Sequence, residues 1–592
     1  MLRTHTCGEL TAAHIGQTVT LSGWVDTRRD HGGVIFIDLR DRYGITQTVF
    51  DPVSHPDAYT IADSARGEYV VNFTGIVRSR PEGQTNAKIA TGEIEVLISE
   101  AKILTKANTP PFEISDKTNT SEDVRFKYRY LDLRRPAMRA KIELRAKMNR
   151  FTREYFSDRW FLEVQTPIFT SSSPEGARDY LIPSRLHPGK FYALPQAPQQ
   201  YKQLLMVAGV DKYFQIAPCF RDEDPRADRH SCEFYQIDCE MSFVDQEDIF
   251  TVAEDFIKQL SHHSAPQKTI ERLEENGQFI RLTHTQAKDL YGSDKPDLRF
   301  DLHFEDVSSI FQDSAFSVFK WALDFGGVVK AFKLPGKTLS RSQIDNITDV
   351  ARANGAKGLA YVTYEADGPK SPILKFLSET EIAALTEQLG AQVGDMIFFG
   401  ADTRESVNKA LGGVRLALRD MLSLADQDTL VFAWVTDFPM YELKPDGSYD
   451  FEHNPFSMPH GGVDAFAPGV DPLSIYGCQY DLALNGYEIL SGSIRNHDIS
   501  SLVKAFEIVG KGEAEVKEKF GAMYEAFGYG VPPHGGFAFG FDRVLMILSD
   551  ETNIREIYAF PKSGKAEDAM MRAPSSVDEK QLEELHIEVK GE

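Results

Sequence analysis

Several features are scarce or absent in this chain of 592 residues. Its five cysteines are scattered and include no Cys-x-x-Cys pair, which argues against a disulfide framework and against a zinc site. No stretch comes near the roughly 18 uninterrupted apolar residues of a membrane span, and MLRTHTCGEL at the start lacks the pattern of a secretory signal. No G-x-x-x-x-G-K-[S/T] phosphate loop is present. We therefore expect a cytoplasmic protein that does not bind a membrane.

Basic residues are fewer than acidic residues in this chain. The chain has 65 Lys and Arg against 88 Asp and Glu, a net charge of −23. Because exposed charges more than about 8 Å apart are screened at physiological salt, a local basic cluster decides RNA binding rather than the total. The candidate clusters are Arg28 and Arg29; Arg78 and Arg80; and Arg125, Lys127, Arg129, Arg134 and Arg135. Each cluster alone also fits an ordinary solvated face.

The length and a hydrophobic content of 42% predict several folded domains. Residues 17–104 contain five short β-branched or alternating runs, at 18–25, 34–39, 46–50, 69–77 and 94–98. Five strands at this spacing predict a small barrel of OB-fold size, a fold that binds single-stranded nucleic acid. Helical periodicity follows over residues 138–161.

Two segments far apart in the chain each carry one arginine beside a strand-like run. They are CFRDEDPRADRHSCEFYQID, with Arg221, and GGFAFGFDRVLMIL, with Arg543. A guanidinium suits an oxyanion or a flat ring. The glycines of the second segment permit close backbone approach, and Gly540 to Arg543 would begin a helix whose N-terminus favours anions. Together these features predict a nucleotide site, although either segment alone also fits a structural role.

The two segments resemble motifs 2 and 3 of class II aminoacyl-tRNA synthetases, and FLEVQTPIFTSSSPEGARDY resembles motif 1. Together with YGSDKPDLR, they are most similar to the bacterial aspartyl-tRNA synthetases, from Gly8 to about Pro574. The resemblance implies a multidomain α+β protein. Its expected parts are an all-β OB-fold anticodon-binding barrel (1–106), a hinge (107–136), an antiparallel-sheet catalytic domain (137–290 and 426–592, the latter with a C-terminal extension) and an inserted α+β domain (291–425).

The resemblance implies an ATP-dependent ligase that makes aspartyl adenylate and esterifies the 3′ end of tRNA. The expected catalytic residues are Arg221, Glu488 and Arg543. Further expected contacts to ATP are Asp222, Glu223, His230, Phe234, Gly540, Phe541 and Asp542. Phe234 and Arg543 would sandwich the adenine. Asp481 and Glu488 would hold Mg²⁺, although two acids in an alternating strand also fit solvent exposure.

The family's aspartate contacts can be carried over residue by residue. They are Glu175, Gln199, Lys202, Arg221, Asp238, His453 and Arg495. Lys202 and Arg495 would face the side-chain carboxylate of aspartate. Asparagine in the same place would leave buried cations uncompensated, at a cost of about 3–5 kcal/mol. The asparaginyl and lysyl synthetases share this domain plan, and these two cations argue against them.

In the barrel, the resemblance assigns anticodon reading to Phe36, which would stack on a base, and to Arg29, Gln47, Arg80 and Glu95. Without that context Phe36 also fits a core aromatic. His31 and Gly83 resemble the subgroup that charges both tRNA(Asp) and tRNA(Asn), which would require an amidotransferase partner. Pro167 lies where the family forms its homodimer. A strictly tRNA(Asp)-specific enzyme and a non-catalytic RNA-binding paralogue are the alternatives.

Overall fold

The structure is a computed structural model that describes residues 2–172, 177–452 and 454–590. The chain forms two compact units. The first holds the chain as far as Glu143 with the short stretches Ala559–Ser563 and Asp568–Ala573, and the second holds the remainder. Among the described helices, none combines the length and the apolar character needed to cross a membrane.

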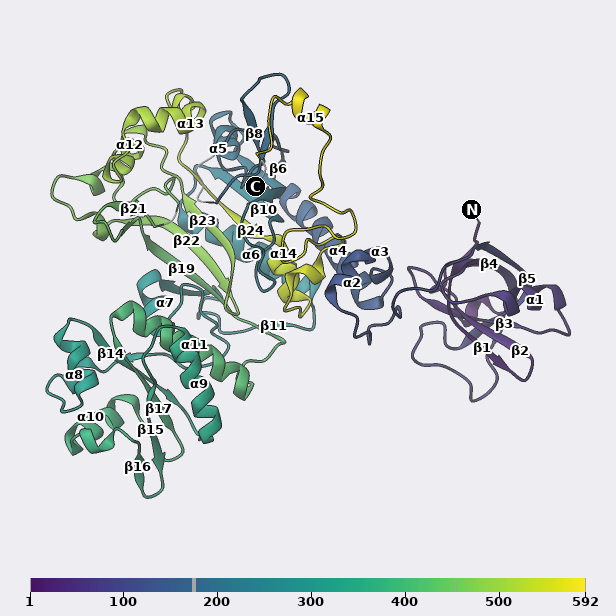
Figure 1. Ribbon diagram of the computed structural model, residues 1–592, viewed down its shortest axis with the longest axis horizontal. Helices are drawn as coiled ribbons and strands as arrows, with labels where there is room; N and C mark the ends of the chain where they lie inside the picture. Colours follow the sequence, from purple (N-terminus) through teal and green to yellow (C-terminus); the bar gives the residue numbers. More distant parts are fainter. Residues whose placement is uncertain (1, 173–176, 453, 591–592) are drawn as a thin grey trace. The chain divides into compact units, whose positions relative to one another are not determined.

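The first unit contains a closed five-stranded barrel with strand order β1-β2-β3-β5-β4 (Figure 1). Its strands are β1 Thr18–His31, β2 Val34–Arg40, β3 Ile45–Phe50, β4 Val70–Ser79 and β5 Ile94–Thr105. Only the β3–β5 pair is parallel among these five. Alternate residues such as Leu21, Ile37 and Phe73 fill the barrel, and α1 (Pro56–Ser64) packs on its core. The predicted barrel is confirmed, with longer first and last strands.

Between the barrel and the second unit, the predicted hinge contains two short helices, α2 (Glu122–Lys127) and α3 (Arg129–Asp132). The carboxylate of Asp132 is fully buried and pairs with Arg129, with Arg135 at 2.7 Å and with Arg125 at 3.3 Å. Part of the third basic cluster is therefore used in internal ion pairs rather than as a surface track for RNA.

The second unit is built on an eight-stranded sheet with order β12-β19-β22-β23-β24-β10-β9-β6. The strands are β6 Leu162–Glu163, β9 Lys212–Phe220, β10 Glu233–Ser242, β12 Ile280–Thr283, β19 Phe432–Pro439, β22 Tyr476–Leu484, β23 Tyr487–Ile494 and β24 His534–Gly540. The edge pairs β12–β19 and β6–β9 are parallel and the inner pairs are antiparallel. The expected antiparallel catalytic sheet is confirmed.

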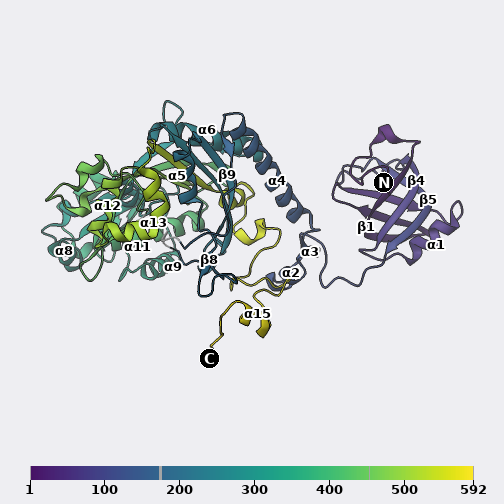
Figure 2. The ribbon, with the colours of Figure 1, turned by 90° about the horizontal axis from the view of Figure 1, so that it is seen from above.

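Helices α4 (Pro136–Ser157, predicted as 138–161) and α6 (Gln246–Ser264) cover one face of this sheet, together with α14 (Phe541–Leu548) (Figure 2). In β10, Ile237, Cys239 and Met241 pack toward them. Because side chains alternate along a strand, Gln236, Asp238 and Glu240 face the other side. On that side lie α5 (Gln199–Val207), α12 (Ile499–Ile508) and α13 (Glu513–Phe527), grouped together.

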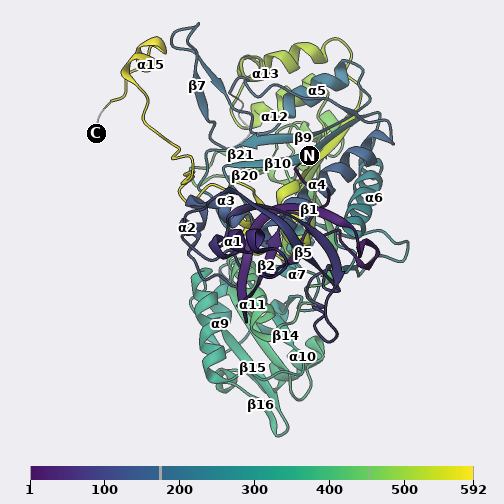
Figure 3. The ribbon, with the colours of Figure 1, turned by 90° about the vertical axis from the view of Figure 1, so that its right-hand side faces the viewer.

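The chain between β12 and β19 folds into a separate α+β domain, as expected. Its antiparallel sheet has the order β13-β14-β17-β15-β16, with strands Glu305–Asp306, Val328–Leu334, Met396–Asp402, Ala360–Glu365 and Gly368–Lys370. Helices α9 (Arg341–Ala353) and α11 (Arg404–Leu422) cover one face, and α8 (Ser317–Asp324) and α10 (Glu379–Leu389) cover the other. Figure 3 shows α9 and α10 on opposite sides of the sheet. In the chain, this α+β domain follows α7 (His284–Tyr291), and its helix α11 contacts α7.

Candidate functional site

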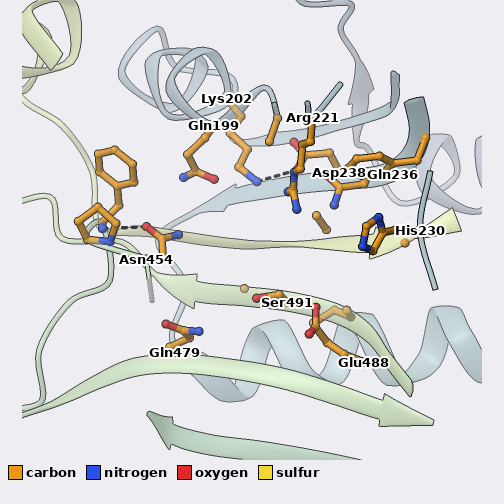
Figure 4. Close-up of a pocket in the computed structure, with 18 of the residues that line it drawn as sticks. Gln199, Lys202, Arg221, His230, Gln236, Asp238, Asn454, Gln479, Glu488 and Ser491 are labelled. Carbon is orange, nitrogen blue, oxygen red and sulfur yellow. Dashed lines mark hydrogen bonds and ion pairs between the residues drawn. The ribbon is translucent and has the colours of Figure 1, made fainter. Parts of the chain in front are cut away.

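A cavity of about 660 Å³ lies between the eight-stranded sheet and the helices α5, α12 and α13. The four cations singled out in the sequence all line it: Lys202 on α5, Arg221 after β9, Arg495 after β23, and Arg543 on α14 (Phe541–Leu548). Figure 4 shows several of the lining side chains converging on one space. The other predicted residues that line it are Gln199, Glu223, His230, Phe234, Asp238, Glu488, Gly540 and Asp542.

Some predicted residues are placed differently. Phe541 is fully buried in the sheet core, and neither it nor Asp222 lines the cavity in the described part of the chain. The Asp542 carboxylate accepts hydrogen bonds from Arg145 at 2.6 Å and from the Tyr235 amide at 2.7 Å, so it anchors α14 to β10. Glu175 and His453 lie outside the described residues.

Four buried charges form a cluster at the base of the cavity, named here the buried charge cluster: Lys202, Asp238, Glu240 and Arg495. Lys202 Nζ is 2.7 Å from Asp238 Oδ1 (Figure 4). It is 3.5 Å from Glu240 Oε2. Arg495 donates from Nε and one terminal nitrogen to the two oxygens of Glu240, at 2.8 and 3.0 Å. Each side chain is at most 2% exposed. This geometry fixes both cations in place.

The pKa shifts within the buried charge cluster have distinct causes. Burial raises the pKa of Asp238, and the opposing effect of Lys202 is smaller. Burial would also raise the pKa of Glu240, but Arg495 and Lys202 together outweigh it and the pKa is lowered. Burial would lower the pKa of Arg495, and Glu240 reverses that direction. Glu240 is therefore the carboxylate that holds the cluster ionised.

Three buried polar atoms at the cavity have no hydrogen-bond partner within the described structure. They are Gln199 Nε2, Asp238 Oδ2 and Arg221 Nε. Buried polar groups are almost always paired, so unpaired ones at a cavity wall indicate positions that a ligand satisfies. One carboxylate acceptor and two donors match a molecule that carries an ammonium group together with carboxylate oxygens.

Gly536 on β24 makes room for the buried charge cluster. A Cβ atom at this position would lie 2.1 Å from Glu240 Oε2 and 2.1 Å from the Cys239 carbonyl oxygen. Any larger side chain must displace the Glu240 carboxylate and, through it, Arg495. This glycine is therefore required by close packing rather than by backbone conformation.

The other end of the cavity carries the residues expected to bind nucleotide. Arg543 lies on the first turn of α14, as predicted, and donates to the Glu488 carbonyl oxygen. Its guanidinium is also 3.9 Å from the Glu488 carboxylate. Arg221 lies over the ring of Phe234, 5.1 Å from its centroid. Burial lowers the pKa of His230, which favours its neutral form. The arrangement presents guanidinium groups and an aromatic face to a ligand.

Asp481 lies on β22 opposite Ser491 of β23, and Glu488 lies further along β23, opposite Ala483. Asp481 does not line the cavity itself, but its Oδ1 is buried without a hydrogen-bond partner within the described residues. Burial, and next to it the charge of Glu488, raises the pKa of Asp481 well above its ordinary value. Two such carboxylates fit a hard divalent cation. Among the described residues, no group of three or more His, Cys, Asp or Glu side chains could hold a metal ion.

The barrel carries a second set of predicted residues, linked by hydrogen bonds across its surface. Arg29 pairs with Asp38 at 2.9 Å and donates to Gln47 at 3.3 Å, and Gln47 donates to Glu95 at 2.9 Å. Phe36 pairs with Arg29 in register and is half-buried between the core residues at 35 and 37. An aromatic ring surrounded by hydrogen-bonding groups suits an unstacked base.

Three more predicted barrel residues lie near this face or on loops. Arg80 donates from Nε to the Ile94 carbonyl oxygen at 3.1 Å. His31, at the end of β1, meets Phe36 edge-on, with ring centroids 6.0 Å apart. Gly83, in the loop after β4, has φ +78° with open space around it, so a lysine there would be strained although not crowded.

Comparison with known families decides what kind of protein this is. Residues 121–564 match the family described as tRNA synthetases class II (D, K and N), and residues 19–104 match the OB-fold nucleic acid binding domain. The chain belongs to the class II tRNA synthetases. The resemblance seen in its three motifs is thereby confirmed, and the OB-fold barrel and the catalytic sheet are the two expected parts of such a synthetase.

Relatives of this synthetase include two bacterial proteins named aspartate--tRNA(Asp/Asn) ligase. The one from Chlorobaculum parvum is 50% identical over 589 residues, covering 99% of this chain and 96% of the relative. The one from Beijerinckia indica is 49% identical and covers 99% and 98%. Both proteins match this synthetase over nearly their whole length.

Solved structures share the fold. The aspartyl tRNA synthetase from Entamoeba histolytica gives a TM-score of 0.55 at 20% identity, covering 93% of this chain and 90% of that chain. The asparaginyl-tRNA synthetase from Pyrococcus horikoshii, complexed with asparaginyl-adenylate, gives 0.56 at 19% identity and covers 95% and 99%. At these identities the likeness establishes the fold of the synthetase and not its substrate.

Sequence reasoning missed Glu240, the residue that joins the two buried cations of the synthetase. A signal was available, because Glu240 follows Asp238 by two positions in a strand and must share its face. Gln236, Asn454, Gln479 and Ser491 also line the cavity without having been predicted (Figure 4).

Proposed function

We propose that this synthetase is an aspartate–tRNA ligase, which makes aspartyl adenylate from L-aspartate and ATP and transfers the aspartyl group to the 3′ end of tRNA(Asp) and tRNA(Asn). The buried charge cluster carries the proposal. Two fixed cations, Lys202 and Arg495, lie beside an unpaired oxygen of Asp238 in the cavity that Arg221 and Arg543 also line. This arrangement suits a small amino acid with an ionised side chain.

The activation step brings two anions together, the α-carboxylate of aspartate and the α-phosphate of ATP. The carboxylate is already ionised at pH 7, so the site needs cations and positioned donors rather than a general base. Arg221, with its unpaired Nε, is suited to bridge the carboxylate and the phosphate. Arg543 and the start of α14 supply further positive potential. Bound Mg²⁺, held by Asp481 and Glu488, would neutralise phosphate charge.

The transfer step then uses the terminal ribose of the tRNA. Its hydroxyl oxygen forms the new ester bond while the bond between the acyl carbon and the phosphate oxygen breaks. AMP leaves with that electron pair, and the hydroxyl proton is released. The residues of the cavity hold the adenylate in place for this attack.

Exchange of labelled pyrophosphate into ATP tests the amino acid. We expect exchange that depends on aspartate and none that depends on asparagine or lysine, because an amide NH₂ or an ammonium group would place donors against the N–H donors of Lys202 and Arg495, whereas a carboxylate accepts from them. Exchange with asparagine alone would overturn the aspartate assignment. Absence of exchange with any of the three would favour the non-catalytic, RNA-binding alternative.

The tRNA choice is a separate part of the proposal. His31 and Gly83 support charging of both tRNAs, because His31 lies against Phe36 and can bond a further base, while Gly83 adds neither charge nor bulk. Charging purified tRNA(Asp) and tRNA(Asn) side by side tests it, and we expect comparable rates. Charging of tRNA(Asp) alone would support the strictly specific alternative, and the variant His31→Leu/Gly83→Lys should move the protein toward that behaviour.

Three further features complete the proposal. A homodimer is supported by exposed apolar side chains flanking Pro167, namely Trp160 (87% exposed), Leu162 (57%) and Phe169 (61%). Sedimentation of the full chain tests it.

Charging of tRNA(Asn) with aspartate would require an amidotransferase partner that converts the attached aspartate to asparagine. The protein would act in the cytoplasm, where its tRNA substrates are.

A further inference from the structure

One end of the cavity is built by segments that the activation chemistry leaves unused. Lys511, which follows α12, and Lys519 on α13 line this end together with Phe506 and Phe520. Figure 4 shows Asn454 at one side of the cavity and His230 at the other, with Lys202 and Asp238 between them. The two lysines belong to the Asn454 side, because the segment after Asn454 packs against α13 through Phe456 and Phe520, whose ring centroids are 4.9 Å apart.

Aromatic packing makes this end of the cavity rigid. Phe506 contacts Phe520 at 5.6 Å and Phe451 at 4.9 Å between ring centroids, and these rings join one apolar cluster under α12 and α13. α13 is kinked at Phe520, where φ is −124° and ψ is 26°, directly after Lys519 and before Gly521. The backbone that carries Lys519 is therefore fixed by buried neighbours.

The positive charge of the two lysines is only weakly compensated. Lys519 Nζ lies 3.0 Å from Glu515, but both side chains are 37% exposed, and exposed pairs of this kind are weak. No ion pair or hydrogen bond of the Lys511 ammonium group occurs in the described part of the chain, and its acidic neighbour Asp450 is itself held by Lys444 at 2.5 Å. Lys511 has no such partner in the described chain and the partner of Lys519 is weakly held, so both ammonium groups can bind an anion that enters the cavity.

Glu452 is the other acid that lines this end of the cavity. Burial raises its pKa above the ordinary value, and the smaller effect of Lys288 does not cancel this shift. No ion pair between Glu452 and Lys511 or Lys519 occurs in the described part of the chain. The ammonium groups of the two lysines therefore remain accessible to an anion that enters the cavity.

We propose that Lys511 and Lys519 bind phosphodiester groups of the tRNA 3′ strand and position its terminal ribose over the adenylate. The proposal rests on the proposed function. ATP would be held by Arg221 and Arg543, and aspartate by the buried charge cluster, so the remaining anion that must reach the cavity is the single-stranded RNA end. Lysine binds a phosphate as a mobile point charge, which suits a backbone that enters and leaves in each cycle.

The chain offers a matched control for testing these lysines. Lys517, on the same helix, pairs with Glu513 at 3.0 Å in the same i,i+4 geometry as Lys519 with Glu515, but it does not line the cavity. The double variant Lys511→Ala/Lys519→Ala is compared with Lys517→Ala. Aspartate-dependent pyrophosphate exchange is measured first, and single-turnover transfer from preformed adenylate is then measured over a range of tRNA and salt concentrations.

We expect exchange by the double variant to change less than about twofold, because exchange needs no tRNA. Transfer at low tRNA concentration should fall at least about tenfold, and the logarithmic salt dependence of tRNA binding should become shallower by about 1.4, the value for two contacts to a single strand. Lys517→Ala should match the wild type in all three measurements. Lys511→Arg/Lys519→Arg should restore transfer, since the charge is kept.

A tRNA shortened by its last three nucleotides distinguishes the sources of phosphate. With this RNA the double variant and the wild type should bind equally, because the contacted phosphates are gone. A raised KM for ATP, pyrophosphate or aspartate in the exchange reaction would instead assign the lysines to those anions and overturn the proposal, as would transfer equal to that of Lys517→Ala. Failure of the wild type to catalyse exchange would contradict the proposed function itself, a different outcome.

Discussion

Polar contacts link charged side chains both in the cavity and on the barrel surface that carries Arg29, called here the barrel face. The two regions differ in how far these side chains are exposed to solvent. Arg495 is 2% exposed and its partner Glu240 is fully buried, whereas Arg29 of the barrel is 45% exposed. Removing one partner of a buried pair leaves an uncompensated charge, while an exposed pair exchanges its partner for water and salt. The cavity is therefore built for fixed selectivity, and the barrel face for salt-dependent, adjustable binding.

The largest expected effect comes from Arg495→Ala. This change leaves the Glu240 carboxylate buried without its main partner, which costs about 3–5 kcal/mol. Aspartate-dependent pyrophosphate exchange should be abolished, while ATP binding stays measurable by calorimetry. Aspartate activation at the wild-type rate would refute the role of Arg495. It would also contradict the proposed difference between the buried charges of the cavity and the exposed charges of the barrel.

A smaller effect is expected from Gly536→Ala. The new methyl group would overlap Glu240 Oε2, and overpacking of this kind costs about 1–3 kcal/mol. Urea denaturation should show lower stability, and the KM for aspartate should rise. Gly358→Ala is the matched control, since a Cβ there meets no atom within 4 Å. Equal effects of the two substitutions would contradict the packing argument.

On the barrel, Arg29→Ala should lower tRNA affinity about tenfold and reduce the salt dependence of binding. Stability should change by less than about 1 kcal/mol, because the pair with Asp38 is exposed. Pyrophosphate exchange should not change. Arg42→Ala serves as the control, since Arg42 is 66% exposed and its only ion pair in the described chain, at 3.4 Å, is with Glu143. A similar loss of affinity in both variants would mean that general charge, and not this face, binds the RNA.

The smallest effect concerns pH. Burial lowers the pKa of His534 from its usual 6.5, with Gln203 and the Pro532 carbonyl oxygen as its ring partners. A depressed folded-state pKa contributes stability that is present above pH 6.5 and lost as the pH falls, by at most about 1.4 kcal/mol per pH unit. Denaturation of wild type and His534→Gln at several pH values tests this, and identical slopes would contradict it.

The sequence predicted the barrel and the helix after it well, because both have strong local periodicity. It predicted the neighbours of Arg543 less well. Successive residues of a helix point about 100° apart, so Phe541 enters the core and Asp542 anchors the helix while Arg543 reaches the cavity. Nothing local marked Lys511 or Lys519, since their position depends on how α12 and α13 pack. The arginines around Asp132 looked like an RNA track because sequence shows charge but not burial.

The position of β24 has a consequence for how the protein is made. It is the last strand of the large sheet to leave the ribosome, yet it lies between β23 and β10. Until residues 534–540 emerge, the nascent sheet consists of two halves, each with an open edge, and unpaired edges invite contact with other chains. A ribosome that stalls shortly before this strand would release an aggregation-prone chain. The barrel, in contrast, is complete by Thr105 and can close early in synthesis.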